Sequence, residues 1–348
     1  MSDSVLLSEI AEQPSVIERL LKTAASKVEA IAADLSSRGL RHVVIAARGS
    51  SDNAARYAQY LLGSHNRLTV TLATPSLFTC YRTPPAMSGA LVVGISQSGE
   101  SPDLIAVVEE GRKQGCPTLA ITNVEGSPLA AITDHTIVLG AGRERSIAAT
   151  KTYTAQLAAI AMLSTALSRN EQWRRELAAV PEHVAAALYV ERESVVAAAA
   201  ALKDAGHGVV LGRGFNFATA FEAALKAKEL AYVAVEPYSS ADFQHGPIAL
   251  IETGFAAVVF NMAGAVSAEV ESLLRTIRER GARPVVFSNE PSSLELAAAP
   301  VALPAGMPEW VSPMAAIVPA QLLAFHLSRQ RGYDPDNPRG LNKVTKTT

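Results

Sequence analysis

The sequence predicts an α/β protein built from two similar halves, each a parallel sheet covered by helices on both faces. Short aliphatic runs alternate with stretches of helical length, which is typical of βαβ units. The chain also resembles itself: His42–Gly49 matches His207–Gly214 at an offset of 165 residues, and Val92–Asn123 matches Val258–Asn289 at an offset of 166. Its 348 residues leave room for two domains of ordinary size. Two copies of one ancestral unit therefore explain the pattern better than two unrelated domains.

Strands are expected at the short aliphatic runs and helices in the segments that connect them. Among the helices, Asp103–Gln114 is clearly bounded, by Ser101 as a capping residue, Pro102 in the first turn and Gly115 after its end. The expected strands are Val43–Ala47, Leu91–Ile95, Thr118–Ile121, Thr136–Leu139, Val209–Leu211, Ala256–Phe260 and Pro284–Phe287.

The chain is expected to divide into four parts. Residues 1–37 form a helical lead-in, residues 38–190 the first half and residues 191–332 the second half. The boundary region contains Pro181, between two alanine-rich helical stretches. Residues 333–348 are rich in Pro, Asn and Thr and predict an irregular tail.

Composition excludes several classes of protein. The chain has 31 Lys and Arg against 33 Asp and Glu, so its net charge of −2 offers no general attraction to nucleic acid or to an anionic membrane. Apolar stretches such as Ala158–Leu167 are too short to span a bilayer, and the N-terminus lacks the pattern of a signal peptide. Cys80 and Cys116 form neither a CxxC motif nor a Cys/His cluster. We therefore expect a cytoplasmic protein without a structural metal.

Two loops at the expected strand ends are rich in hydroxyl groups. Arg48–Asn53 (RGSSDN) follows the first strand, and Ser96–Ser101 (SQSGES) lies between a strand and a helix. In a doubly wound sheet the ligand lies beyond the carboxyl ends of the strands, where backbone N–H groups and a helix N-terminus suit a phosphate or carboxylate. One such loop alone would be an ordinary turn. Two at one edge favour a phosphate site, and neither is a dinucleotide or nucleoside triphosphate motif.

The SQSGES loop resembles the signature of sugar isomerase (SIS) domains. The resemblance continues, in order along nearly the whole chain, through Glu144–Lys151, Glu222–Glu229, His245–Pro247 and Pro338–Lys343. It implies two tandem SIS subdomains, each with a flavodoxin-like parallel sheet in an αβα sandwich. The chain is similar to the isomerase half of glucosamine-6-phosphate synthase and more closely to stand-alone SIS-type glucosamine-6-phosphate deaminases. A glutaminase domain is not expected, because the chain starts with Met1-Ser2 and reaches its first strand within about 40 residues.

The resemblance implies a site for a hexose phosphate and an activity that needs no cofactor. Two neighbours of the sugar differ from the synthase pattern: Ala149 stands where the synthase has serine, and Asn342 where it has alanine. Ser101 replaces a threonine and keeps the hydroxyl. The residues expected to bind the substrate are Gly49, Ser50, Ser51, Ser96, Gln97, Ser98, Ser101, Ala149 and Asn342.

Glu222, Lys226 and Glu229 are the first catalytic candidates. Their spacing of i, i+4 and i+7 puts them on one face of a helix. By itself the pattern favours a solvated face with an ion pair. The position of the helix after a second-half strand, and its match to the family's catalytic helix, favour catalysis instead. Moving a hydrogen between C1 and C2 of a sugar requires a base, and Glu229 is the candidate.

His245 and Lys343 complete the expected catalytic set. Lone histidines are mostly structural, but His245 suits proton transfer in ring opening and matches the family motif, in which this histidine enters the neighbouring subunit's site. A homodimer is therefore expected. Lys343, near the C-terminus, would ordinarily be a disordered lysine. The resemblance implies that it acts at the carbonyl carbon, as a Schiff base or by orienting the open-chain sugar.

Three functions remain open on the sequence. The leading one is the conversion of glucosamine 6-phosphate and water to fructose 6-phosphate and ammonia. A second is a fructosamine-6-phosphate deglycase or another hexose-phosphate aldose–ketose isomerase. A third, of another class, is a non-catalytic sugar-phosphate sensor. The presence of Glu229, His245 and Lys343 together disfavours the sensor, which needs only the phosphate loops.

Overall fold

A computed structural model describes residues 4–190 and 192–343, and it contains two five-stranded sheets in which every pairing is parallel. The first sheet has the order β2-β1-β3-β4-β5 and the second β10-β9-β8-β6-β7. Counted from the first strand of each half, the two orders are the same. The prediction of a duplicated α/β unit is therefore confirmed. The strands are β1 (His42–Ala46), β2 (Thr69–Leu72), β3 (Ala90–Ser96), β4 (Thr118–Thr122), β5 (His135–Val138), β6 (His207–Gly212), β7 (Ala234–Ser239), β8 (Ala256–Asn261), β9 (Arg283–Ser288) and β10 (Ala299–Ala302).

All seven predicted strands are present, and the three that the sequence analysis missed, β2, β7 and β10, are edge strands. The residues of β2 are all at least partly exposed, so it lacks the continuous apolar run of a buried parallel strand. The other two contain Pro237 and Pro300, and a proline within a run argues against a strand unless the strand lies at an edge. Three of the four edge strands were missed, and only β5 was predicted, because sequence rules best recognise the buried middle of a sheet.

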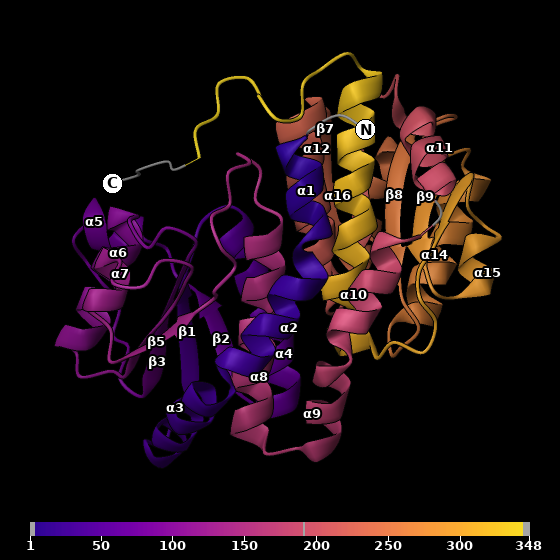
Figure 1. The fold of residues 1–348 in the computed structure, drawn as a ribbon. Helices are drawn as coiled ribbons and strands as arrows, with labels where there is room; N and C mark the ends of the chain where they lie inside the picture. The colour runs from indigo at the N-terminus through magenta and orange to yellow at the C-terminus, as the bar shows by residue number, and fades with distance from the viewer. Residues whose placement is uncertain (1–3, 191, 344–348) are drawn as a thin grey trace. The chain divides into compact units, whose positions relative to one another are not determined.

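The first compact unit carries the sheet β1–β5 and comprises residues 15–144, 151–178 and 342–343 of the described chain. Figure 1 shows helices on both sides of this sheet, with α5, α6 and α7 on one side and α4 and α8 on the other. Helix α2 (Gln13–Thr23) begins before the unit does. The remaining helices are α3 (Ala25–Ser37), α4 (Ser50–Asn66), α5 (Ser76–Thr79), α6 (Pro102–Lys113), α7 (Pro128–Ala131), α8 (Lys151–Ser168) and α9 (Glu171–Ala178).

The second compact unit carries the sheet β6–β10 and comprises residues 4–14, 145–150, 179–190 and 192–341. Its long helices α12 and α16 pack against each other, and α16 also contacts α1, α10 and α11. The helices are α1 (Val5–Ala11), α10 (Val180–Leu188), α11 (Arg192–Leu202), α12 (Asn216–Ala231), α13 (Ser240–Gln244), α14 (Ser267–Glu279), α15 (Pro291–Leu294) and α16 (Ser312–Gln330), with 3₁₀ turns η1 (Pro247–Leu250) and η2 (Glu309–Val311).

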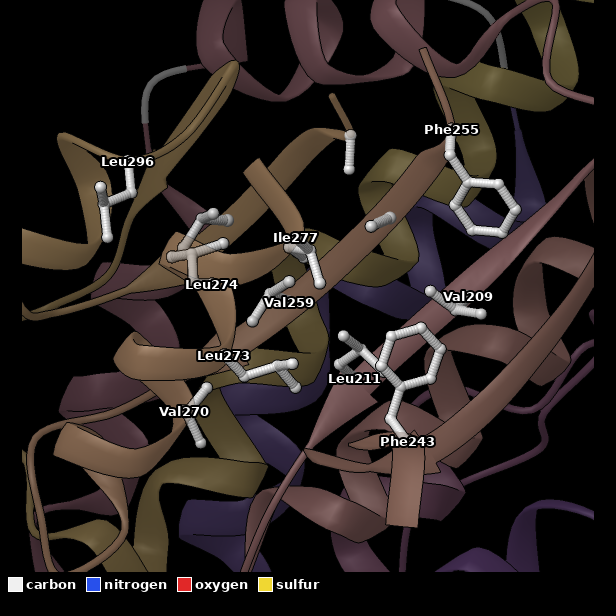
Figure 2. Packing of buried hydrophobic residues seen from close by; sticks show 13 residues of the cluster. Val209, Leu211, Phe243, Phe255, Val259, Val270, Leu273, Leu274, Ile277 and Leu296 are labelled. Carbon is white, nitrogen blue, oxygen red and sulfur yellow. The ribbon is translucent and has the colours of Figure 1, made fainter. Parts of the chain in front are cut away.

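Aliphatic side chains fill the space between each sheet and its helices. Figure 2 shows the cluster in the second unit, where Val209 and Val259 of the sheet lie opposite Leu273 and Ile277 of α14. Each such side chain contributes about 1.5–3 kcal/mol when it is fully buried. A matching cluster in the first unit joins the sheet to α6 and α7. These cores hold the strand ends, and therefore the loops that follow them, in place.

Helix α16 is a long apolar segment that the sequence analysis did not identify. Within the described residues, Glu309–Gln330 has the length and mean hydropathy (1.4) of a membrane-spanning helix, but 89% of its apolar window is buried inside the fold. A helix that is apolar on all sides belongs either to a membrane or to a protein core. Packing against α10, α11 and α12 accounts for the composition of α16 as a core helix.

Candidate active site

The two serine-rich loops lie at adjacent strand ends of the first sheet. Strands β1 and β3 are direct neighbours, with Ala46 paired to Gly94, although β2 lies between them in the sequence. The strand order reverses at this pair, which is the switch point where doubly wound sheets bind their ligands. The β1 loop runs into α4, which begins at Ser50, and the β3 loop runs into α6, which begins at Pro102. Two helix N-termini therefore meet the predicted phosphate loops.

Hydroxyl groups of the β3 loop maintain its shape. Ser96 Oγ accepts a hydrogen bond from the Gly99 backbone N–H at 3.0 Å, and Ser98 Oγ accepts one from Glu100 N–H at 3.3 Å. Gly99 has φ +67°, and a side chain there would collide with Ser127. The prediction of Ser101 as a capping residue is only half right, since it occupies the N-cap position of α6 but makes no side-chain capping bond. Its hydroxyl is not used to cap the helix.

The β1 loop is anchored to the rest of the first unit by side chains. Arg48 Nε and Nη2 both lie 2.8 Å from Oδ2 of the buried Asp103 in the first turn of α6. Ser51 is buried and accepts a hydrogen bond from Gln156 Nε2 of α8 at 2.9 Å. Gly49 adopts φ +55° at the N-cap of α4. The two loops are therefore cross-linked by the ion pair between Arg48 and Asp103.

Lys343 is held in place by a carboxylate. Its Nζ lies 2.7 Å from Glu144 Oε2, and the buried Glu144 also accepts hydrogen bonds from the backbone and hydroxyl groups of Thr152. The interpretation of Lys343 as a disordered tail residue is therefore wrong. Its neighbour Asn342 is exposed. In the sequence, Glu144 stands out only as part of the motif Glu144–Lys151, because nothing local indicates that a residue almost 200 positions away would pair with it.

A second carboxylate that sequence analysis missed supports the loop containing Ala149. Glu9 of α1 accepts hydrogen bonds from the backbone N–H groups of Arg145 (2.6 Å) and Ser146 (3.0 Å). Ala149 is itself partly buried. The signal for Glu9 was present in the sequence: a glutamate lies in the same buried stripe as Leu6 and Ile10. A buried carboxylate needs hydrogen-bond donors, and the loop supplies them.

Three of the four charged residues of α12, Glu222, Lys226 and Glu229, form a compact cluster. Lys226 Nζ lies 2.5 Å from Glu229 Oε2 and 3.4 Å from Glu222 Oε1. The side chains of Glu222 and Lys226 are completely or almost completely buried, whereas that of Glu229 is 23% exposed. Burial by itself would lower the pKa of Lys226, but the two carboxylates outweigh burial and raise it. Lys226 is thus a fixed cation, and the interpretation of this helix face as solvated is wrong.

His245 lies on the surface of the second unit. It forms the C-cap of α13, where its backbone N–H bonds to the Asp242 carbonyl at 3.0 Å, and its side chain is exposed. Gly246 follows with φ +125°, a conformation that starts the turn into η1. The imidazole is therefore presented to the outside of its own unit rather than used in its core. Within the described residues, no group of three or more His, Cys, Asp or Glu side chains could hold a metal ion.

Residues 38–166 and 201–329 each match the SIS domain family. The chain belongs to the SIS domain family. The two matched segments contain the two sheets, so the predicted tandem SIS architecture is confirmed.

Named relatives are similar to this SIS protein over almost its whole length. It is 34% identical, over 97% of its length, to a glutamine–fructose-6-phosphate aminotransferase [isomerizing] of Thermococcus kodakarensis. It is also 34% identical, over 98% of its length, to the protein of the same name from Methanothermobacter thermautotrophicus. The chain spans 57% of the length of each.

Solved structures agree on the fold. The C-terminal domain of glucosamine-fructose-6-phosphate aminotransferase from Francisella tularensis superposes with a TM-score of 0.89 at 28% identity, covering 97% of this chain and 99% of that one. A candidate phosphosugar isomerase from Silicibacter pomeroyi gives 0.87 at 32% identity, covering 96% and 100%. A glucosamine-6-phosphate deaminase from Thermotoga maritima gives 0.79 at 23% identity, covering 99% and 100%, which supports the fold alone.

Proposed function

We propose that this SIS protein is an amino-sugar phosphate isomerase that releases ammonia, converting glucosamine 6-phosphate and water to fructose 6-phosphate and ammonia. The observation that carries the proposal is the cluster on α12: of its three charged side chains, only Glu229 keeps access to solvent while a buried lysine holds it in place. A carboxylate held in this way suits proton transfer to and from carbon. Relatives named as fructose-6-phosphate aminotransferases, one of them described as isomerizing, support chemistry on a hexose phosphate.

The substrate phosphate binds at the switch point of the first sheet. Ser96, Gln97, Ser98 and Ser101 from the β3 loop and Gly49–Ser51 from the β1 loop provide backbone N–H and hydroxyl donors around the N-termini of α4 and α6. Helix N-termini favour a dianion without a lysine. The phosphate then fixes the far end of the sugar and limits the positions that its carbon chain can take.

Glu229 moves the proton between the two carbons. After the ring opens, it removes the proton from C2 of the open-chain aldehyde. The C2–H electron pair forms the C1–C2 double bond, the C1=O π pair moves to the oxygen, and that oxygen takes up a proton to give an enolamine. When Glu229 returns the proton to C1, the nitrogen lone pair forms the C2=N bond of an iminium ion. Water adds to C2 and releases a proton, which balances the one taken up by the C1 oxygen. A proton then passes from the C2 hydroxyl to the nitrogen, and the C2–N bond breaks to give ammonia and fructose 6-phosphate, with no net oxidation. Lys226 stays protonated throughout and positions Glu229.

His245 and Lys343 act in other steps of the reaction, at the ring and at the open-chain carbonyl group. His245 transfers the proton that opens the pyranose ring, a task suited to imidazole near neutral pH. Lys343, paired with Glu144, presents an ammonium group that orients the carbonyl oxygen of the open-chain sugar. The ion pair favours this role over a Schiff base, because a Schiff base requires the neutral amine.

A deglycase acting on fructosamine 6-phosphate is the second candidate. Two positions favour it: Ala149 and Asn342 differ from the serine and alanine that the sequence comparison with the synthase leads one to expect. Both changes alter hydrogen bonding next to the sugar rather than to the phosphate. They therefore affect which amino sugar is accepted and leave the phosphate anchor unchanged.

Ammonia release and isomerisation, measured on glucosamine, other amino-hexose and fructosamine 6-phosphates, test the proposal. Glu229→Gln should keep its affinity for the substrate, measured by calorimetry, while turnover falls by ~10²-fold or more, because the base is lost. Glu279→Gln is the matched control, since Glu279 is an exposed glutamate at the end of α14 in the same unit, and it should keep full turnover.

Each result has a defined meaning. Faster ammonia release from fructosamine 6-phosphate than from glucosamine 6-phosphate would favour the deglycase. Tight sugar-phosphate binding with neither isomerisation nor ammonia release in the unmodified protein would refute an enzyme and establish a sensor. A Glu229→Gln variant that turns over normally would exclude Glu229 as the base.

A further inference from the structure

The two halves share a cross-link at the switch point. In the first half Arg48, at the end of β1, pairs with Asp103 in the first turn of α6. In the second half Arg213, at the end of β6, pairs with Glu269 in the first turn of α14. The equivalent residues are offset by 165 and 166 positions, the same offsets as the internal repeat. The framework of an anion site is therefore present in both halves.

The loops that would bind the anion differ between the halves. At the end of β3 the first half has Ser96-Gln97-Ser98-Gly99, whereas the equivalent positions, directly after β8, are Met262-Ala263-Gly264-Ala265. These four positions carry no hydroxyl group in the second half, although Ser267, the equivalent of Ser101, keeps one at the start of α14. The backbone N–H groups of this loop are donors, as in any loop that leads into a helix, and that of Ala263 bonds to Asn289 Oδ1 at 2.7 Å.

Within the second half, the side chain of Glu309 lies at the loops that follow β6 and β8. Glu309 Oε2, from the turn η2, accepts a hydrogen bond from the Ala265 backbone N–H at 2.7 Å. A Cβ at Gly264 would collide with the same oxygen, and a Cβ at Gly214 would lie 3.2 Å from Oε1. The carboxylate is thus hydrogen-bonded to the loop after β8 and lies near Gly214 in the loop after β6. Burial raises the pKa of Glu309, and the bond from Ala265 opposes this.

We propose that the switch point of the second half is an oxyanion-binding site of carboxylate size, which Glu309 of the same chain occupies as an internal ligand. The first half takes its anion from outside, and the second half supplies its own. This inference goes beyond the proposed function and does not depend on it, because the site lies wholly in the second unit.

The internal ligand also connects two long helices of this unit. The backbone carbonyl of Glu309 accepts a hydrogen bond from Ser312 Oγ at 2.7 Å, and Ser312 Oγ accepts one from Asn216 Nδ2 at 2.7 Å. Asn216 is the first residue of α12, and Ser312 is the first residue of α16. Glu309 therefore fixes the start of α16, which packs along α12, against the strand ends.

Rescue with formate tests this assignment without any activity measurement. Glu309→Ala removes the carboxylate and should lower Tm by roughly 3–8 °C, the shift expected for loss of such contacts in a unit of this size. Formate should then bind in the vacated space and restore at least half of the lost Tm in a saturable manner. The Tm of the unmodified protein and of Glu279→Ala, an exposed control, should change little with formate.

A second variant keeps the test decisive if Glu309→Ala does not fold. Glu309→Gln retains an oxygen that accepts from Ala265 but lacks the charge, so it should show a smaller loss of Tm and no response to formate. A Glu309→Gln protein as stable as the unmodified one would overturn the proposal, since the site would then not require an anion. A Glu309→Ala protein of undiminished Tm, or equal formate effects on all variants, would also overturn it.

Discussion

At the scale of single residues, Lys226 decides whether the α12 cluster is stable. It lies between Glu222 and Glu229, and both Lys226 and Glu222 are inaccessible to water. A buried ion pair adds little net stability compared with apolar residues, but removing one partner leaves the other charge in a low-dielectric environment. The cluster is thus better explained by the positioning of Glu229 than by stability.

Lys226→Met should therefore be strongly destabilising. We expect a loss of about 3–5 kcal/mol, because the buried Glu222 carboxylate loses its cation. Lys226→Met combined with Glu222→Leu should recover most of that loss. Urea denaturation midpoints measure both, with Lys228→Met as the control, since Lys228 is the exposed lysine of the same helix. A double variant no more stable than Lys226→Met would show that the lysine acts through contacts other than Glu222.

At the scale of elements, a histidine at the contact between α4 and α9 makes the first unit sensitive to acid. The ring centroids of His65 and Trp173 are 3.7 Å apart. Burial lowers the pKa of His65 to about 4, while the charge of Glu176 opposes the shift. The unfolded chain takes up a proton near pH 6.5, and the folded chain does so only near pH 4. Between these values the unfolded state binds more protons, so stability falls as pH falls.

The Tm of the first unit should accordingly decrease from pH 7 to pH 4.5, and His65→Gln should reduce that dependence. Because the imidazole is partly exposed, solvent screening reduces the effect below that of a fully buried group. Thermal unfolding monitored by tryptophan fluorescence, which comes from Trp173 in this unit and Trp310 in the second, measures it at several pH values. His245→Gln, which changes an exposed histidine, should leave the pH dependence as it is. An identical pH dependence in His65→Gln would assign the acid sensitivity to other groups.

At the scale of the whole molecule, we propose that two copies of the chain assemble and that His245 of one copy completes the site of the other. Two observations motivate this: the family resemblance of the His245-Gly246-Pro247 motif, and the exposure of the His245 side chain on its own unit. An isologous dimer would exchange the two histidines symmetrically. Activity would then require the assembled pair.

Mixing inactive His245→Ala with inactive Glu229→Gln, after subunit exchange by mild unfolding and refolding, should restore activity. Random pairing makes half of the dimers mixed, and one of the two sites in each mixed dimer receives both intact residues, so activity should approach roughly a quarter of the unmodified level. The control mixes His245→Ala with the His245→Ala/Glu229→Gln double variant, where no site is complete. Absence of recovery despite proven exchange would place His245 in the site of its own chain or outside catalysis.

The sequence by itself determined the framework of this protein. The internal repeat and the aliphatic runs predicted two parallel sheets and the strands at their centres, because buried parallel strands must be continuously apolar. Strand ends then predicted that the serine loops meet at one edge, since parallel strands share their direction. The helical period placed Glu222, Lys226 and Glu229 on one face for the same kind of local reason.

Tertiary structure decided the rest, where the answer depended on residues far apart in the chain. Only packing showed that the charged face of α12 is buried, since the same spacing also fits a solvated face. Only packing brought Lys343 to Glu144 and placed Glu309 against Gly264 and Ala265. The periodicity of a sequence depends on residues that are close together in the chain and form one helix or strand. A contact between charged residues that are far apart in the chain produces no periodic pattern, so only the folded structure shows it.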